Sequence, residues 1–315
     1  MTLAFLLYSY FPYGGQQRNM LAMAQEAARR GHQVSIFCHL WQGEQPEGLD
    51  IRQVPVTGFA NHTRMERFGA AALQRLAGQQ VDLVVGFIKL PGLDSYYAAD
   101  PCFAEKALNK RGFFYRLAPR TRVYLRLEQA VFAPTANTHI LEVARSERES
   151  YIRHYGTQVE RFHTLIPGIS KTRLAPDNYP AVRARKRAEL AFSADDRVLL
   201  ALGSGFKTKG LDRSINTMAE LRRRNIPAQL LVVGQDNAER FQAQAKALDV
   251  AANVHFLGGR DDIPELLQAA DLLIHPAYRE NTGNGLLEAM IAGLVGIAAL
   301  FNHLGYCHTA NGRIK

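Results

Sequence analysis

Several features of secreted and membrane-spanning proteins are missing from this sequence of 315 residues. It contains only three cysteines, Cys38, Cys102 and Cys307, which lie far apart and form no C-x-x-C pair. This set favours neither a disulfide framework nor a zinc site, and it fits a reducing cytoplasm. The short apolar run at residues 1–8 has no basic segment and no small-residue cleavage site, so we expect no signal peptide. No apolar run reaches the roughly 18 residues that a membrane-spanning helix needs.

The motifs of several enzyme classes are also absent. The sequence has no H-E-x-x-H, no G-x-S-x-G and no D-x-D that would bind a metal–nucleotide pair. The histidines are scattered, so no metal site is expected. His275, which follows a buried apolar run, is interpreted as a packed core histidine rather than as a ligand contact.

Positive charge exceeds negative charge, with 38 Lys and Arg against 29 Asp and Glu and a net charge of +9. This balance is typical of a protein with an anionic partner, which could be nucleic acid, an anionic membrane or a phosphorylated substrate. Much of the charge lies in residues 103–126, where seven basic residues accompany one acid. Basic residues interleaved with aromatics suit a membrane surface, although nucleic acid attracts the same residues and a solvated helix face gives a similar pattern. The residues of this segment that we assign to surface binding are Lys106, Lys110, Arg111, Phe113, Phe114, Tyr115, Arg116, Arg120, Arg122, Tyr124 and Arg126.

Strand and helix patterns alternate along the whole chain and predict two doubly wound α/β domains. In the first half we expect a helix at 16–30, helices in the remaining gaps, and strands at 2–10, 33–38, 51–54, 81–87, 95–98, 138–143 and 162–165. In the second half we expect strands at 197–202, 229–233, 254–257 and 272–275 and helices at 211–224, 238–248, 263–270 and 285–292. The polar, proline-containing stretch 167–180 is the best linker, so the domains are placed at residues 1–166 and 167–315. Two Rossmann-like domains facing a cleft would bind ligands at the carboxyl ends of their strands.

The segment around residue 280 carries the clearest chemistry. A buried strand leads into a polar loop, and a helix begins near Asn284 in a Gly-Asn-Gly context. A helix start offers free N–H groups and partial positive charge, which suit a diphosphate. Glu280 lies before this helix and Glu288 lies about one turn into it, so both carboxylates could accept hydrogen bonds from sugar hydroxyls. Two solvated glutamates on a surface loop are the alternative.

Three other features fit phosphate binding. Residues 203–210 form a Gly-rich turn with Lys209 near its end, although a basic turn that caps a helix would look the same. Arg173 is either a phosphate clamp or an exposed linker arginine. Gly14 and Gly15 allow close backbone approach before the first helix, with a plain turn as the more ordinary explanation. They do not complete G-x-G-x-x-G, and residues 203–210 are not a Walker A loop, so a nicotinamide dinucleotide is disfavoured.

The second half resembles the retaining family 4 glycosyltransferases of GT-B fold. This resemblance rests on the two glutamates at 280 and 288, the pair Lys209-Gly210, and the flanking Pro276 and Leu287. Up to about Leu294 the chain is also similar to the family of lipopolysaccharide core glucosyltransferases, which add the first outer-core hexose to heptose. The matching stretches are residues 10–18, 91–100, 161–163, 167–169 and 275–278.

The resemblance implies a UDP-sugar donor bound by the second domain. Gly15 would approach the diphosphate, Arg173 and Lys209 would neutralise it, Glu280 with the backbone of Thr282 and Gly283 would hold the sugar, Glu288 would accept the ribose hydroxyls, and Arg260 would frame the uracil. Asp100, at the end of an expected strand, is our candidate for orienting the acceptor hydroxyl, so Glu280 and Asp100 are the expected catalytic residues. Transfer with retention would need neither a metal nor a cofactor, because the UDP-sugar is a co-substrate.

The resemblance also implies an acceptor and a location. The acceptor would be the lipopolysaccharide inner core, bound by the first domain. The basic, aromatic segment would place the protein on the cytoplasmic face of the anionic inner membrane, which disfavours nucleic acid as a partner. Glucose is the expected hexose, with galactose and an N-acetylhexosamine as alternatives.

The chain departs from the family pattern after Leu294. The family has proline at the position of Val295, then a strand and a final helix that crosses back onto the first domain. We therefore expect an incomplete second domain, from a truncated or frameshifted reading frame. The alternatives to an active glucosyltransferase are an inactive remnant that still binds UDP-sugar, a nucleotide-sugar epimerase of the same fold and a nucleic-acid binder.

Overall fold

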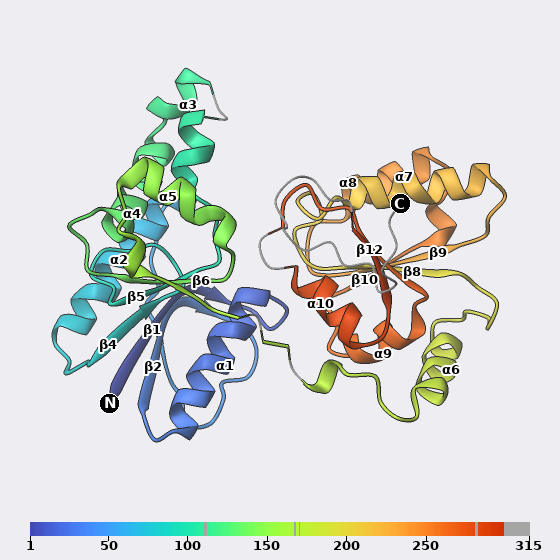
Figure 1. Cartoon of the computed structure of the whole chain (residues 1–315), viewed down its shortest axis with the longest axis horizontal. Coiled ribbons are helices and arrows are strands. Elements are labelled where there is room, and N and C mark those ends of the chain that lie inside the picture. The colour runs from blue at the N-terminus through green and yellow to red at the C-terminus, as the bar shows by residue number, and fades with distance from the viewer. Residues whose placement is uncertain (110–111, 167, 170, 281–282, 299–315) are drawn as a thin grey trace. The chain divides into compact units, whose positions relative to one another are not determined.

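The computed structural model describes residues 1–109, 112–166, 168–169, 171–280 and 283–298. The chain divides into two units, Met1–Ile166 and Pro167–Lys315, and each contains one parallel sheet (Figure 1). Two Rossmann-like α/β units of this kind confirm the fold class expected from the sequence. Among the described residues, no helix is both long enough and apolar enough to cross a membrane.

The sheet of the first unit has the strand order β3-β2-β1-β4-β5-β6-β7, and every neighbouring pair is parallel. Its strands are β1 (Thr2–Tyr10), β2 (Gln33–Trp41), β3 (Asp50–Gln53), β4 (Leu83–Gly86), β5 (Ser95–Ala98), β6 (His139–Glu142) and β7 (Phe162–Thr164). The order reverses between β1 and β4, which creates a topological switch point. The carboxyl ends of all these strands meet at one edge, where the loops that follow β1 and β5 begin.

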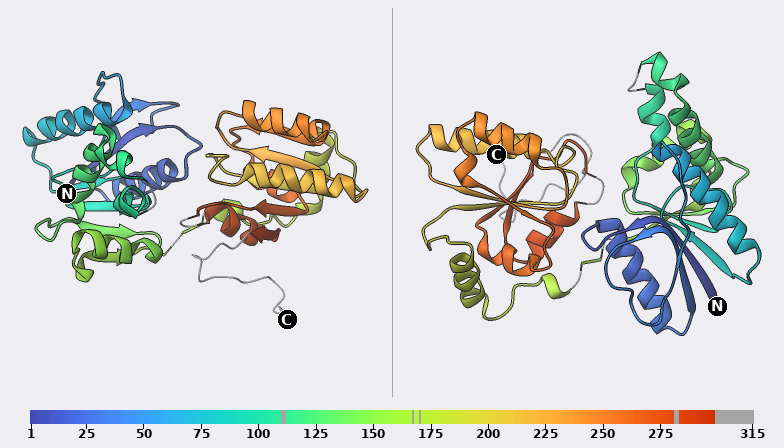
Figure 2. Two further views of the ribbon diagram at one scale, coloured as in Figure 1. Left: turned by 90° about the horizontal axis from the view of Figure 1, so that it is seen from above. Right: turned by 180° about the vertical axis from the view of Figure 1, so that it is seen from behind.

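Helices cover both faces of this sheet (Figures 1 and 2). They are α1 (Gly15–Arg29), α2 (Asn61–Ala77), η1 (Glu105–Asn109), α3 (Phe113–Leu117), α4 (Pro119–Phe132), η2 (Arg145–Glu147), α5 (Arg148–Tyr155) and η3 (Val159–Arg161). Alternation along β1 explains the layers, because successive side chains of a strand point to opposite faces. Leu3, Phe5 and Leu7 pack in a core with α1, whereas Ala4 and Leu6 pack in a core with α2, α4 and α5.

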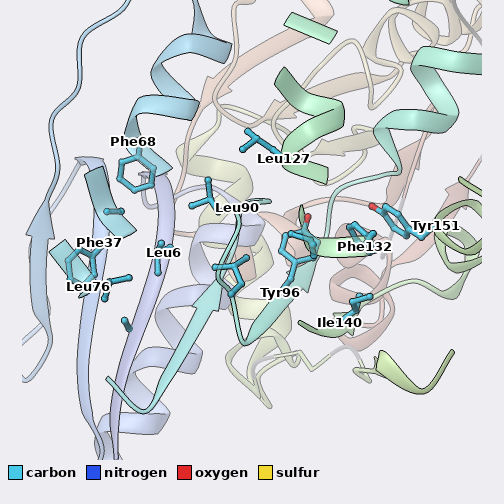
Figure 3. Close-up of a cluster of buried hydrophobic side chains, with 14 of the residues drawn as sticks. Leu6, Phe37, Phe68, Leu76, Leu90, Tyr96, Leu127, Phe132, Ile140 and Tyr151 are labelled. Atoms are coloured by element: carbon cyan, nitrogen blue, oxygen red, sulfur yellow. The ribbon is translucent and has the colours of Figure 1, made fainter. Parts of the chain in front are cut away.

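Stacked aromatic rings form the centre of the second of these cores (Figure 3). The rings of Phe132 on α4 and Tyr151 on α5 lie parallel with centroids 3.7 Å apart, and Tyr96 on β5 meets Phe132 edge-on at 5.8 Å. The Tyr151 hydroxyl donates to the carbonyl oxygen of Asp100 at 2.9 Å. The core therefore fixes the backbone just after β5. Asp100, the residue that we predicted to orient the acceptor hydroxyl, lies there.

The sheet of the second unit has the order β10-β9-β8-β11-β12 and is also parallel throughout. Its strands are β8 (Val198–Leu202), β9 (Gln229–Val233), β10 (Val254–Gly258), β11 (Leu272–His275) and β12 (Val295–Ala298). Its helices are η4 (Lys171–Arg173), α6 (Tyr179–Glu189), α7 (Leu211–Arg223), α8 (Glu239–Ala247), η5 (Ala251–Asn253), α9 (Ile263–Ala269) and α10 (Asn284–Ile291). Leu199 packs in a core with α7 and α8, whereas Val198 and Leu200 pack in a core with α9 and α10.

Two features of this unit differ from the sequence-based expectations. The stretch 167–180 was expected to be linker, but α6 already begins at Tyr179. The sheet also continues after Leu294, because β12 pairs in parallel with β11 from Leu272 opposite Val295. The second sheet therefore keeps this strand, although the sequence departs from the family pattern there. Residues 299–315, to which the expectation of an incomplete domain also applies, lie outside the described residues.

We expect Phe132→Ala to lower the free energy of unfolding by about 3–5 kcal/mol, because it removes a fully buried ring and leaves a cavity against Tyr151. Urea denaturation followed by circular dichroism measures the change. The control is Phe59→Ala, because Phe59 is fully exposed and its truncation should change stability by less than about 0.5 kcal/mol. Equal effects of the two substitutions would contradict this description of the core.

Candidate functional site

Two loops of the second unit contact each other at the carboxyl edge of its sheet. One follows β8 and spans residues 203–210, and the other follows β11 and spans residues 276–283; β8 and β11 are neighbours. The Tyr278 N–H donates to the Thr208 carbonyl oxygen at 2.9 Å. At Gly210, which has φ +73°, a Cβ would lie 2.1 Å from the Pro276 carbonyl oxygen. Only glycine allows the two loops to approach this closely.

This approach brings Lys209 and Glu280 together from positions 71 residues apart. The Glu280 Oε2 accepts hydrogen bonds from Lys209 Nζ at 2.5 Å and from His275 Nε2 at 2.7 Å, and Oε1 accepts one from the Gly283 N–H at 3.1 Å. Burial of this carboxylate raises its pKa, but the hydrogen bond from His275 and the charge of Lys209 outweigh burial and lower the pKa of Glu280 to about 2. Glu280 is therefore ionised at neutral pH and can only accept hydrogen bonds.

Glu288 and Arg173 form a second pair in the same unit. The Arg173 Nε lies 3.8 Å from Glu288 Oε2, and the two side chains are 13% and 11% exposed. Arg173 comes from η4, just after the start of the unit, and Glu288 lies on α10. The side chains of Arg173, Glu280 and Glu288 are all largely buried. The alternative interpretations of Arg173 as an exposed linker residue and of the two glutamates as solvated surface residues are therefore wrong.

The start of α10 lies between the two glutamates. Gly283 is the N-cap residue with φ +69°, and its N–H is bonded to Glu280, while Thr282 lies outside the described residues. Asn284 and Gly285 belong to the first turn, whose N–H groups have no acceptor within the helix. Such groups can bind the oxygen atoms of a phosphate.

Arg260 lies apart from these residues. It follows β10, which is separated from β11 by β9 and β8. Its guanidinium donates to both carboxylate oxygens of Asp262 at 2.8 and 2.6 Å, and Asp262 also accepts from the buried Lys186 of α6 at 2.7 Å. Arg260 is thus held in a fixed ion-pair network.

Two predicted residues belong to the first unit. Gly15 is the first residue of α1, beyond the carboxyl end of β1. A Cβ on the preceding residue, Gly14, would meet the side chains of Gln17 and Phe11 within 3 Å. Asp100 follows β5 with its side chain exposed and its carbonyl oxygen bonded to Tyr151.

The basic segment forms η1, α3 and α4 of the first unit. Its exposed basic and large apolar residues, among those that the structure describes, are Lys106, Phe114, Arg116, Leu117, Arg120, Arg122 and Arg126. Phe114 is 86% exposed, so not every aromatic side chain of this segment is buried in the core. Tyr115 and Tyr124 are half-buried, and Tyr124 lies against Phe103 with ring centroids 5.3 Å apart. Lys110, Arg111 and the Phe113 side chain lie outside what the structure describes.

Sequence reasoning missed two residues. His275 is buried as expected for a core histidine, but it also bonds the carboxylate of Glu280; its place at a strand end, directly before the loop, was the available signal. Glu128 on α4 gave no signal. It is fully buried and accepts hydrogen bonds from Lys89 at 2.5 Å, from the N–H groups of Phe103 and Ala104 at 2.8 Å, and from the Tyr155 hydroxyl at 2.8 Å.

Comparisons with known proteins identify the family of this chain. Residues 13–173 match the family model "Glycosyltransferase Family 4" and residues 182–311 match "Glycosyl transferases group 1", so the second match continues past Leu294. The lipopolysaccharide glucosyltransferase WaaG of Escherichia coli K12 is 42% identical over 311 residues, which cover 98% of this chain and 82% of that protein. The D-inositol 3-phosphate glycosyltransferase of Rhodococcus jostii is 31% identical over 325 residues, with 93% and 71% covered.

Solved structures are similar as well. The crystal structure of WaaG, a glycosyltransferase involved in lipopolysaccharide biosynthesis, matches with a TM-score of 0.91 and 42% identity, over 94% of this chain and 80% of that one. The Anabaena protein HepE in complex with UDP and glucose matches with a TM-score of 0.71 and 18% identity, over 95% and 80% of the two chains. At that identity the likeness concerns the fold alone.

We expect Gly210→Ala to destabilise the second unit by more than about 2 kcal/mol, because it combines a left-handed φ with a clash against Pro276. Gly205→Ala is the matched control. Gly205 has φ +77° but nothing within 4 Å of an added Cβ, so it should cost only the strain of about 1 kcal/mol. Thermal unfolding measures both variants, and an equal loss would show that the loops are not in close contact.

Proposed function

Because this chain belongs to the family 4 glycosyltransferases of GT-B fold, we propose that it transfers glucose with retention from UDP-glucose to heptose of the lipopolysaccharide inner core. The observation that carries the proposal is the 42% identity with a lipopolysaccharide glucosyltransferase over 98% of the chain. The cluster of Lys209, Glu280 and His275 beside the start of α10 supports it, because this cluster pairs a sugar-binding carboxylate with a cation.

In the proposed donor complex, Glu280 accepts hydrogen bonds from the glucose hydroxyls and Glu288 accepts them from the ribose. Lys209, which contacts Glu280 in the structure, turns its ammonium group towards the diphosphate. Arg173 reaches the diphosphate from η4, and Arg260 stabilises the loop that frames the uracil.

In the proposed reaction, the bond between the sugar C1 and the UDP oxygen breaks, and a bond from C1 to the acceptor hydroxyl oxygen forms on the same face. The acceptor proton leaves with UDP. Negative charge grows on the departing diphosphate, where Arg173, Lys209 and the first N–H groups of α10 would stabilise it. With these groups supplying positive charge, we propose that no metal ion and no cofactor is needed. Asp100 would orient the acceptor hydroxyl from the first unit.

We propose that the first unit binds the acceptor at the anionic, cytoplasmic face of the inner membrane and does not bind nucleic acid. The exposed Phe114 and Leu117 next to exposed arginines support this, because apolar side chains insert between lipids whereas arginines attract their head groups.

Lys209→Met should lower turnover about 100-fold, because one charged donor no longer stabilises the diphosphate. The assay measures UDP release from UDP-glucose with a heptosylated core acceptor. Addition of a metal chelator should leave the rate of UDP release unchanged. Lys207→Met in the same loop is the control, since Lys207 is exposed, and it should retain nearly full activity. Consumption of UDP-glucose without acceptor would indicate an epimerase, and donor binding without turnover would indicate an inactive remnant.

Replacing Arg120 and Arg122 by Gln should weaken binding to vesicles that contain phosphatidylglycerol about 30-fold, at about 1 kcal/mol for each arginine. Co-sedimentation at two salt concentrations measures the effect. Arg29→Gln with Arg30→Gln is the control, because it removes the same charge from α1, outside the basic segment. An equal loss in the control, or a salt-sensitive shift with DNA and none with vesicles, would contradict the membrane proposal.

A further inference from the structure

We propose that His275 is a positioning residue for donor-sugar recognition, which holds the Glu280 carboxylate in place while Lys209 turns towards the diphosphate. The proposal rests on the proposed function, because it takes Glu280 to be the group that contacts the sugar.

Two donors share one oxygen of Glu280. Lys209 Nζ and His275 Nε2 both bond Oε2, at 2.5 and 2.7 Å. Because the carboxylate is ionised, it cannot donate, so the His275 Nε2 must carry the hydrogen. An imidazole whose Nε2 carries the hydrogen can donate to Oε2 and hold the carboxylate in one orientation.

The two donors differ in rigidity. His275 ends β11, which is paired on both sides by β8 and β12, and the residue is only 4% exposed. Its side chain has two rotatable bonds. Lys209 lies in a loop, its side chain is 29% exposed, and it has a long flexible stem. His275 is therefore the contact that can keep a fixed geometry.

Donor binding makes this difference important. The Lys209 ammonium faces two anionic groups once the diphosphate is present, so its contact with Glu280 weakens. Without the bond from His275, Oε2 would then be less firmly oriented at the moment when the carboxylate must bind a sugar hydroxyl. With His275 in place, Oε2 stays anchored and Oε1 remains beside the start of α10, where the Gly283 N–H contacts it.

A purely structural histidine would affect the whole unit, whereas a positioning histidine would affect only ligands that contain the sugar. The test therefore compares the affinity for UDP with that for UDP-glucose, both measured by isothermal titration calorimetry on the full chain. His275→Gln places an amide N–H near the position of Nε2, and His275→Asn places it near Nδ1 instead. The two variants match in polarity and differ in whether they can reach Glu280.

We expect His275→Asn to weaken UDP-glucose binding about 10-fold with UDP binding unchanged, and His275→Gln to restore binding to within about 3-fold of the wild type. Unchanged UDP-glucose binding in the Asn variant, equal weakening of both ligands, or no rescue by Gln would overturn the proposal. Thermal unfolding of both variants accompanies the titrations, and because UDP binding reports on the folded site, loss of structure would appear as equal weakening of both ligands.

The variant Glu280→Gln distinguishes a failure of the sugar-binding role of Glu280 from a failure of the positioning role of His275. If this variant binds UDP-glucose as tightly as the wild type does, the sugar-binding role of Glu280 in the proposed function is wrong and the role of His275 falls with it. If Glu280→Gln weakens UDP-glucose binding and His275→Asn does not, only the role of His275 is wrong.

Discussion

The common direction of the strands in the second unit is the constraint on which its site depends. Since β8 and β11 run side by side and in parallel, the loops that follow them start at the same edge of the sheet. Gly210 then lets these loops touch, and Lys209 meets Glu280 across a separation of 71 residues. The position of the ionised carboxylate beside Lys209, His275 and the start of α10 follows from this geometry. A reversal of either strand would place the two loops at opposite edges.

Much of the fold was predictable because a buried parallel strand is a short apolar run with clear ends. The expected ranges 95–98, 229–233 and 272–275 coincide with β5, β9 and β11. The strand β12 was missed, because it has only four residues and follows an apolar helix closely, so its ends are not marked in the sequence. The beginning of α6 was hidden by prolines, of which Pro180 stands in the first turn, where a helix tolerates it.

The candidate site was predictable only in part. Gly-Asn-Gly beside a strand end pointed to Glu280 and Glu288, because local sequence determines the start of a helix. The partners of these residues depend on the tertiary fold. Nothing in the sequence links Arg173 with Glu288, Lys186 with Asp262, or Glu128 with the N–H groups of Phe103 and Ala104. These pairs join elements that lie far apart along the chain, so they become visible only when the units are folded.

Glu128 lies on the buried side of α4, opposite the exposed arginines of the basic segment. One side of α4 carries this buried carboxylate, which is bonded to Lys89 and to the backbone where the segment begins, and the other side carries exposed arginines. The anchoring contacts involve main-chain groups and core residues, so they do not depend on which side chains face outwards. The outer charges can therefore change without altering the fold, and an engineer could exchange the side chains of that face as one set. Changes at Glu128 itself have no such freedom, because they would remove the carboxylate partner of the largely buried Lys89 and leave the N–H groups of Phe103 and Ala104 without this acceptor.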